Sequence, residues 1–95
     1  MASTAELTAL RDAILSSPEV AAARAALDAA TAAAGAAQAA LKADSPHEVY
    51  AELVRLENAR DAARHALAKL TAPADAYQAR IDKIARGKVA RHIWG

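Results

Sequence analysis

The chain has 95 residues, of which 24% are charged and 55% hydrophobic, and its formal net charge is +1 at pH 7. Alanine supplies 31 of the 52 hydrophobic residues, so the potential core is thin for a domain of this size. The absence of Cys excludes disulfides and thiolate metal sites. No uncharged run approaches the roughly 20 residues that span a bilayer, and the N-terminus lacks the basic and apolar regions of a secretory signal. We therefore expect one soluble domain with a cytoplasmic location.

The first predicted helix spans about residues 4–16. Ser3 and Glu6 form the S-x-x-E pattern of a capping box, in which each side chain satisfies the free backbone amide of the other residue. The residues that follow prefer helix, as nearly the whole alanine-rich chain does, and no strand pattern is present. The larger apolar residues share one face of this helix: Leu7, Leu10 and Ile14.

Two long helices are predicted next, at about 18–43 and 46–71. Each begins at a Ser-Pro pair, at residues 17–18 and 45–46, because serine caps a helix and proline fits the first helical position, where its missing N–H costs nothing. The second pair opens a full capping box with Glu48. Both helices would be about 39 Å long at 1.5 Å per residue, and the short connection between them favours adjacent, antiparallel packing.

An apolar residue recurs every seven residues in both long helices. A second series lies between its members, so spacings of three and four alternate over three heptads, which is the pattern of a coiled-coil seam. When the chain folds back at Ser45, residues whose numbers sum to 90 come level, and large residues then face small ones, as Leu27 faces Ala63. The seam residues are Val20, Leu27, Ala34 and Leu41 in the first helix, and Val49, Leu56, Ala63 and Leu70 in the second.

Three aspects of these helices leave alternatives open. The first alternative is that the two long helices resemble each other only because both are rich in alanine. The large seam residues and the two Ser-Pro starts, however, do not follow from a high alanine content. Arg60 occupies a seam position, and we expect its stem to pack while its charged end extends to solvent; the alternative is a polar specificity role. The first long helix is uncharged on every side between Asp28 and Lys42, so the terminal helices or another protomer must cover its back.

A third restart is predicted at Pro73, which would open a last short helix that ends at Gly87. The expected fold class is therefore all-α: an antiparallel, alanine-rich coiled-coil helical hairpin, flanked by a short helix at each end. Residues 1–87 would form one helical domain, and residues 88–95 a basic C-terminal tail.

The C-terminal segment differs in composition from the rest of the chain. Residues 79–95 carry a net charge of +4 and the only Trp, whereas the preceding residues sum to −3. In one interpretation Ile81 and Ile84 pack on the hairpin and the basic residues are merely solvated. In another, the segment docks on a protein partner with Trp94 as an aromatic anchor, and contact with nucleic-acid phosphates is a further alternative. The docking residues would be Arg86, Lys88, Arg91, Ile93 and Trp94.

No arrangement of residues in the sequence predicts catalysis, a cofactor or a metal site. His47, His65 and His92 lie on different segments without ligand spacing, and there is no Cys nucleophile or glycine-rich phosphate loop. We therefore expect a non-enzymatic structural or adaptor subunit that associates through its helices within a larger assembly, such as a virion, a secretion machine or a regulatory complex. Its partner would be a protein or a second copy, with no membrane contact. The alternative is a nucleic-acid-binding accessory protein that uses the basic C-terminal segment.

Overall fold

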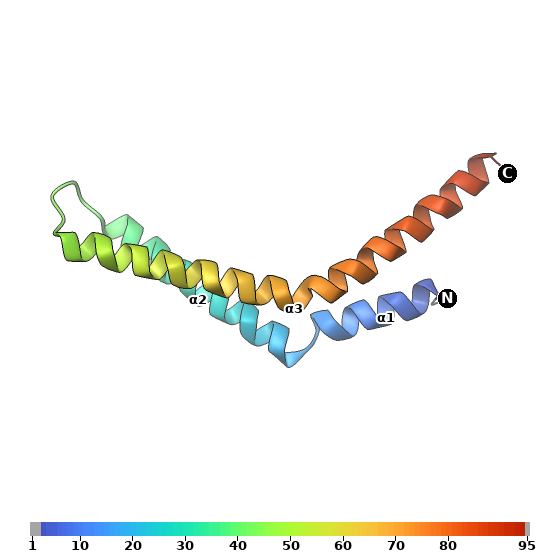
Figure 1. Ribbon diagram of the computed structural model, residues 1–95, viewed down its shortest axis with the longest axis horizontal. Coiled ribbons are helices and arrows are strands. Elements are labelled where there is room, and N and C mark those ends of the chain that lie inside the picture. Colours follow the sequence, from blue (N-terminus) through green and yellow to red (C-terminus); the bar gives the residue numbers. More distant parts are fainter. Residues whose placement is uncertain (1–2, 95) are drawn as a thin grey trace. The chain divides into compact units, whose positions relative to one another are not determined.

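The protein is all-helical over the residues that the structure describes. The computed structural model describes residues 3–94, with the side chains of residues 3–88. Within this range it contains three helices and no strand: α1 (Thr4–Leu15), α2 (Pro18–Ala40) and α3 (His47–Trp94) (Figure 1). The expected all-α class is therefore confirmed.

The chain divides into two compact units. The central unit, Ala21–Lys69, contains most of α2 and the first half of α3. The terminal unit contains α1, the first residues of α2 and the part of α3 that begins at Leu70. The single helix α3 thus contributes to both units, and the boundary between them lies three residues before Pro73.

α1 forms and ends as its sequence predicts, to within one residue. Ser3 has an extended backbone, with φ −74° and ψ 162°, and its Oγ accepts a hydrogen bond from the Glu6 N–H at 3.1 Å. This bond satisfies one of the free amides of the first turn. At the other end the N–H and the Oγ of Ser16 both donate to the carbonyl of Asp12, at 2.9 and 2.6 Å. The helix therefore carries a side-chain cap at its start and a closing turn at its end.

α2 begins where the sequence predicts and ends earlier. Ser17 caps the helix, since its Oγ accepts a hydrogen bond from the Val20 N–H at 3.3 Å, and Pro18 is the first helical residue. The expectation that this helix continues to about residue 43 is wrong, because it ends at Ala40.

The predicted capping box of Ser45 and Glu48 is also wrong. The Oγ of Ser45 accepts a hydrogen bond from the Lys42 N–H at 2.9 Å, so this serine serves the loop that follows α2. α3 begins two residues after the serine, where the Val49 N–H donates to the Pro46 carbonyl at 3.0 Å. The early end of α2 explains the difference, because it frees a loop amide that the serine hydroxyl then satisfies.

The largest difference from the expectation is the length of α3. The helix has 48 residues and continues through Pro73 and Gly87, so the chain has three helices and not four. Pro73 weakens the helix because it has no N–H to donate to the Lys69 carbonyl. However, partly buried residues continue at spacings of three and four on both sides of it, and packing along this stripe favours an unbroken helix. Gly87 lacks the positive φ of a C-terminal glycine cap, so the predicted helix end there is wrong.

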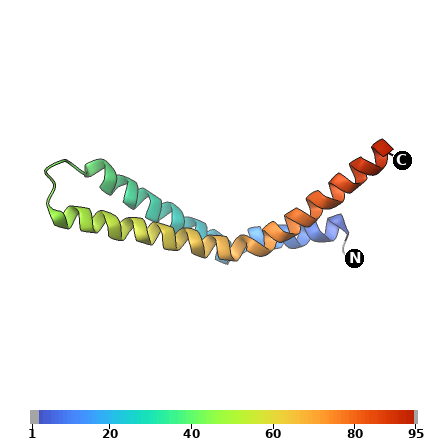
Figure 2. The same cartoon turned by 45° about the horizontal axis from the view of Figure 1, so that its top comes forward.

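In the central unit α2 lies beside the first half of α3, and the two helices run in opposite directions (Figures 1 and 2). Burial in this unit follows the predicted seam positions. In α3 Leu53 is buried. The half-buried residues of this part of α3 are Leu56, Arg60, Ala63 and Leu67 at seam positions, and Glu57 and Asp61 beside them. Between residues 21 and 40, the positions of α2 that are not exposed are Ala23, Leu27, Ala30, Ala34 and Ala37.

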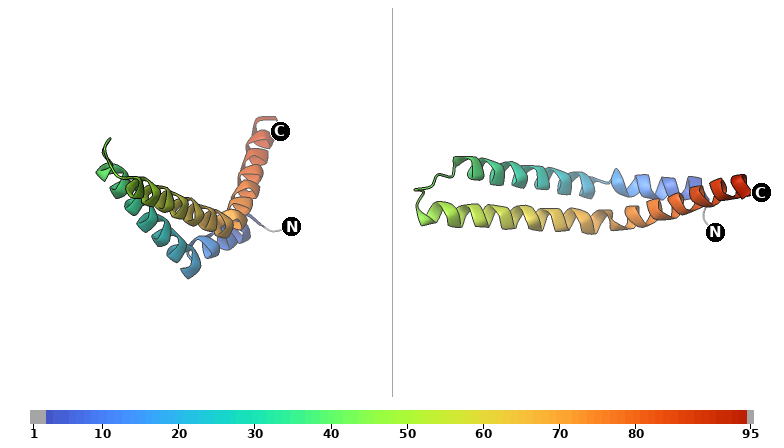
Figure 3. Two further views of the ribbon diagram at one scale, coloured as in Figure 1. Left: turned by 60° about the vertical axis from the view of Figure 1, so that its left-hand side comes forward. Right: turned by 90° about the horizontal axis from the view of Figure 1, so that it is seen from above.

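The terminal unit sets α1 against the second half of α3, again with opposite chain directions (Figures 1 and 3). The stripe of α3 continues here beyond the last predicted seam residue, through Ala74, which is buried, to Tyr77, Ile81 and Ile84, which are half-buried. On the α1 side Leu7 is 0% exposed. The packing of α3 therefore extends over far more of its length than the sequence analysis assigned to the hairpin.

The core that these contacts produce is small. Among the residues whose side chains are described, no polar or charged residue is buried, and no buried side-chain nitrogen or oxygen lacks a hydrogen-bond partner. Several large apolar side chains are exposed: Leu10, Val49, Tyr50, Val54 and Leu70. The buried residues are Leu7, Val20, Ala34, Leu53 and Ala74.

Candidate interaction surfaces

Among the described residues, no three His, Asp or Glu side chains gather where they could hold a metal ion. His47 and His65 are exposed, and the side chain of His92 lies outside the described part. In that same part of the chain, none of the helices combines the length and the apolar character needed to cross a membrane.

The eight predicted seam residues differ in burial. Val20 and Ala34 are buried, and Val49 and Leu70, at the two ends of the series in α3, are 37% and 40% exposed. The series in α3 is thus exposed at both of its ends, whereas Val20, at one end of the series in α2, is buried. The remaining four members are half-buried: Leu27, Leu41, Leu56 and Ala63.

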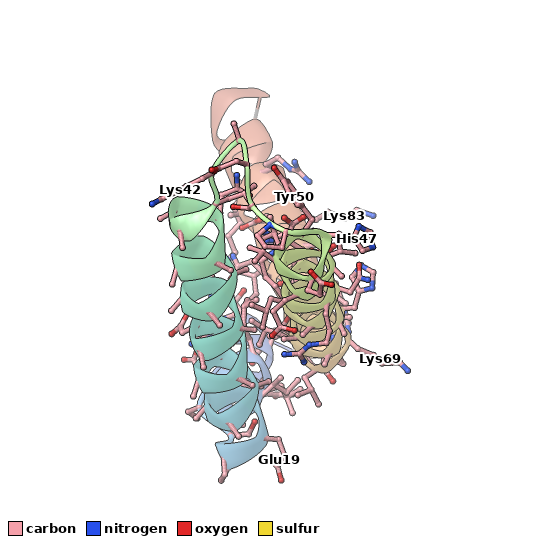
Figure 4. The ribbon with its side chains drawn as sticks, turned by 90° about the vertical axis from the view of Figure 1, so that its left-hand side faces the viewer. Glu19, Lys42, His47, Tyr50, Lys69 and Lys83 are labelled. Carbon is pink, nitrogen blue, oxygen red and sulfur yellow. The ribbon has the colours of Figure 1, made fainter. Side chains whose placement is uncertain are left out.

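The loop between α2 and α3 is closed by side chains of the central unit. The hydroxyl of Tyr50 donates a hydrogen bond to the Lys42 carbonyl at 3.1 Å, and Ser45 accepts from the N–H of the same lysine. Figure 4 shows Tyr50 at the loop end of α3 and Lys42 at the end of α2. These two bonds satisfy the N–H and the carbonyl of Lys42. The hydroxyls of Ser45 and Tyr50 therefore stabilise the loop.

Arg60 directs its charged end to a neighbouring acid at the surface. Its Nε and Nη2 donate to Oδ1 of Asp61 at 3.2 Å, and its side chain is 29% exposed. Asp61 also lies 3.8 Å from Nη1 of Arg64. This geometry agrees with a packed stem and a solvated guanidinium, and it supplies no partner for Arg60 across the seam.

Glu52 and Arg55 form an ion pair on the exposed surface of α3. Arg55 donates from Nε to Oε2 of Glu52 at 2.8 Å and from Nη2 to the other carboxylate oxygen. These hydrogen bonds lower the pKa of the Glu52 carboxyl below its ordinary value and raise the pKa of Arg55. Both side chains are exposed, so the pair is screened by solvent and is not a major source of stability.

The outer face of α2, opposite the seam, is exposed and almost free of charge. From residue 29 to residue 40 every residue of the helix is Ala, Gly, Thr or Gln, and every one outside the seam is exposed. A Cβ atom added at Gly35 would meet nothing within 4 Å. The packing of α2 within its own chain therefore does not require glycine at this position. The outer face is the first candidate interaction surface.

The basic end of α3 is the second candidate surface. Its described cations, Arg80, Lys83, Arg86 and Lys88, are exposed, and none of these four has an ion pair with any described side chain. Each of the arginines that forms an ion pair, by contrast, does so with an acid one or three residues away. Of the predicted docking residues, Arg86 and Lys88 are exposed, and the side chains of Arg91, Ile93 and Trp94 lie outside the described part.

Comparison with known proteins gave no match. No protein-family model, no curated protein and no solved structure is similar enough to this chain to be matched. The function is therefore argued from the residues and the two surfaces.

A polar link in the terminal unit was not predicted from the sequence. Nη1 of Arg11 donates a hydrogen bond to Oε1 of Gln78, and Nε2 of Gln78 donates to Oδ1 of Asp82 at 2.9 Å. A signal was present, because Ala74, Tyr77 and the residues after them extend the heptad spacing beyond Leu70. Pro73 hid this signal, since a proline normally ends such a pattern.

Proposed function

We propose that this protein is a non-enzymatic structural or adaptor subunit that works by association of its helices within a larger assembly. The observation that carries the proposal is that α2 is apolar on two faces: one lines the seam, and the other is exposed and uncharged from residue 29 to residue 40. A helix that is apolar all round is normally buried all round. A cytoplasmic location or a place in a virion is part of the same proposal.

Within this proposal the central unit is an alanine-rich coiled-coil hairpin that acts as a rigid platform. Support comes from the burial of α2, which is confined to the seam positions between residues 21 and 40. Alanine along the seam allows helix axes to approach at the near end of the usual range of about 8–10 Å. Cysteines introduced at Leu27 and Ala63 should crosslink within one chain on mild oxidation. A disulfide between two copies of residue 27 would replace the hairpin with an intermolecular coil.

We assign the outer face of α2 to a second copy of the chain, in antiparallel orientation. Asp28 and Lys42 are the first charges on either side of the uncharged stretch, and each lies seven residues from Gly35. An antiparallel contact centred on Gly35 brings Asp28 of one copy level with Lys42 of the other, so the charges are complementary at both ends. Glycine at the centre permits close approach of the two backbones.

Sedimentation of the full chain at micromolar concentration tests this association. The chain should form dimers or larger species, and Ala36→Glu should dissociate them because it places a charge in the middle of the outer face. Ala62→Glu is the matched control, since Ala62 is exposed on α3 on the side away from the seam and the change in helix propensity is the same. A stable, cooperatively melting monomer would exclude self-association, and equal effects of both variants would exclude this face.

The proposal also assigns partner docking to the C-terminal end of α3. Arg86 and Lys88 are exposed there without an ion pair to a described side chain, and Trp94 would add an aromatic anchor. Truncation after Gly87 removes Lys88 and Trp94 but keeps Arg86, so it should weaken partner binding and leave the melting temperature unchanged. A fall in melting temperature of several degrees, which is the scale of about 1 kcal/mol in a domain of this size, would instead make these residues part of the fold.

A further inference from the structure

We propose that the partner of the basic end of α3 is a nucleic acid, whose backbone phosphates are bound by Arg80, Lys83 and Arg86. The inference rests on the docking role proposed above for this end of the helix and names the chemistry of the partner. It is independent of the self-association proposed for α2, which involves residues of the central unit.

Because α3 continues through Gly87, these basic residues have regular positions along a single helix. Arg80, Lys83 and Arg86 follow one another at intervals of three residues within the helix. At this spacing neighbouring side chains lie about 5–6 Å apart at their Cβ atoms, and each step advances about 4.5 Å along the axis. All three residues are exposed, and Figure 4 shows the Lys83 side chain extending from α3. We call Arg80, Lys83 and Arg86 the basic ridge.

Charge on the basic ridge is not neutralised within the described part of the chain. The only acid between residues 79 and 88 is Asp82, and its Oδ1 accepts a hydrogen bond from Gln78 at 2.9 Å. No ion pair joins a ridge residue to any described side chain. With Asp82 counted, residues 79–87 keep a net charge of +2, and such a segment attracts a polyanion over the range of a Debye length, about 8 Å at physiological salt.

The surroundings of the basic ridge favour a phosphate polymer over other partners. The large apolar residues of this segment, Ile81 and Ile84, are half-buried on the stripe that faces α1. The other exposed residues from 79 to 87 are Ala79, Asp82, Ala85 and Gly87, none of which has a large apolar side chain. Membrane-surface helices need a large apolar face, and protein interfaces depend on large buried anchors. Binding to phosphates needs neither, because charge neutralisation and counterion release supply the affinity.

Gly87 also favours the binding of a polymer at this end of α3. A Cβ atom at this position would meet nothing within 4 Å, so packing within the chain does not require glycine, which weakens a helix relative to alanine by about 0.5–1 kcal/mol. The missing side chain leaves the helix backbone next to Arg86 open to close approach by a polymer.

Fluorescence anisotropy with a labelled duplex DNA and a labelled single-stranded RNA tests the inference on the full chain. The logarithm of the affinity should fall linearly with the logarithm of salt concentration, with a slope of about −3 for three phosphate contacts on the duplex. The double variant Lys83→Gln/Arg86→Gln should bind more weakly and reduce the magnitude of the slope by about 2.

Arg24→Gln/Lys69→Gln is the matched control, because it removes two exposed cations of the central unit and changes the net charge equally. Its affinity and salt slope should stay close to those of the unmodified chain, and circular dichroism should show all chains equally helical. Equal losses in both double variants would mean that net charge alone drives binding and would overturn the assignment to the ridge.

Three further results would overturn the proposal: no binding of either nucleic acid at 50 mM salt, equal binding of poly-glutamate, or binding of phosphatidylserine vesicles without binding of nucleic acid. The docking role itself would survive the last two results, because an acidic or lipid partner would still need this end of the helix. It would fail together with the inference only if truncation after Gly87 and the Lys83→Gln/Arg86→Gln variant both left every interaction of the chain unchanged.

Discussion

Arg11 of α1 is hydrogen-bonded to Gln78 of α3, 67 residues further along the chain. Arg11 also donates from Nε to Asp12 at 2.9 Å, and Gln78 donates to Asp82 at 2.9 Å. The four side chains form a chain of hydrogen bonds between the two helices of the terminal unit, in the order Asp12, Arg11, Gln78 and Asp82. This connection positions α1 along α3 in a unit with few large buried side chains.

We expect Gln78→Ala to weaken the attachment of α1 to α3. Loss of a hydrogen bond to a charged group should lower the free energy of unfolding by about 1.5–3 kcal/mol if the bond were buried, and by less here because Arg11 is partly exposed. Gln38→Ala is the control, since Gln38 is exposed on α2. Urea unfolding gives the stability, and hydrogen exchange of the α1 amides locates the change. Equal effects of both variants would exclude a specific role for this bond.

Pro73→Ala should stabilise the protein. Alanine supplies the N–H that the Lys69 carbonyl lacks and removes the ring from the helix interior, where proline is about 3 kcal/mol less favourable than alanine. Thermal unfolding should show a higher melting temperature, and the amides near residue 73 should exchange more slowly. Pro46→Ala is the control, because Pro46 precedes the first residue of α3. An unchanged or lower melting temperature would argue that the helix is broken at Pro73.

Leu7→Ala should destabilise the protein far more than Leu10→Ala. The two leucines lie in the same helix, but Leu7 is 0% exposed and Leu10 is 45% exposed. Truncation of a buried leucine costs about 2–5 kcal/mol, which is a large share of the stability of a small domain. Chemical denaturation of both variants measures the difference. If the two changes cost the same, α1 does not pack through Leu7.

The Glu52 carboxyl should titrate below the ordinary range of glutamate, because Arg55 donates two hydrogen bonds to it. Arg55→Ala should raise the midpoint, which carbon-13 NMR of the side chain measures directly. The folded-state pKa is lowered, so the small contribution of this pair is present above the unfolded pKa and is lost as the pH falls through the folded pKa. A midpoint that is the same in both proteins would show that the pair is not formed in solution.

Local sequence signals identified the starts of the first two helices correctly. The hydroxyls of Ser3 and Ser17 accept the backbone amides that the capping pattern predicts, because a cap involves residues only three apart in the chain. The same signal was misleading at Ser45, whose hydroxyl bonds to the Lys42 N–H instead. Two amides compete for that serine, and sequence alone does not show which of them lies closer.

The sequence by itself determined the helical class, since helix propensity depends on the chain alone. The spacing of its apolar residues also predicted three of the buried side chains, Val20, Ala34 and Leu53. Only the tertiary structure decided how far α3 extends. Pro73 and Gly87 each weaken a helix locally. In the terminal unit, however, Ala74 is buried and Tyr77, Ile81 and Ile84 are half-buried, and burial of apolar surface there offsets the local cost. The link between Arg11 and Gln78 belongs to the same class of features, because two residues so distant in sequence meet only after the helices have packed.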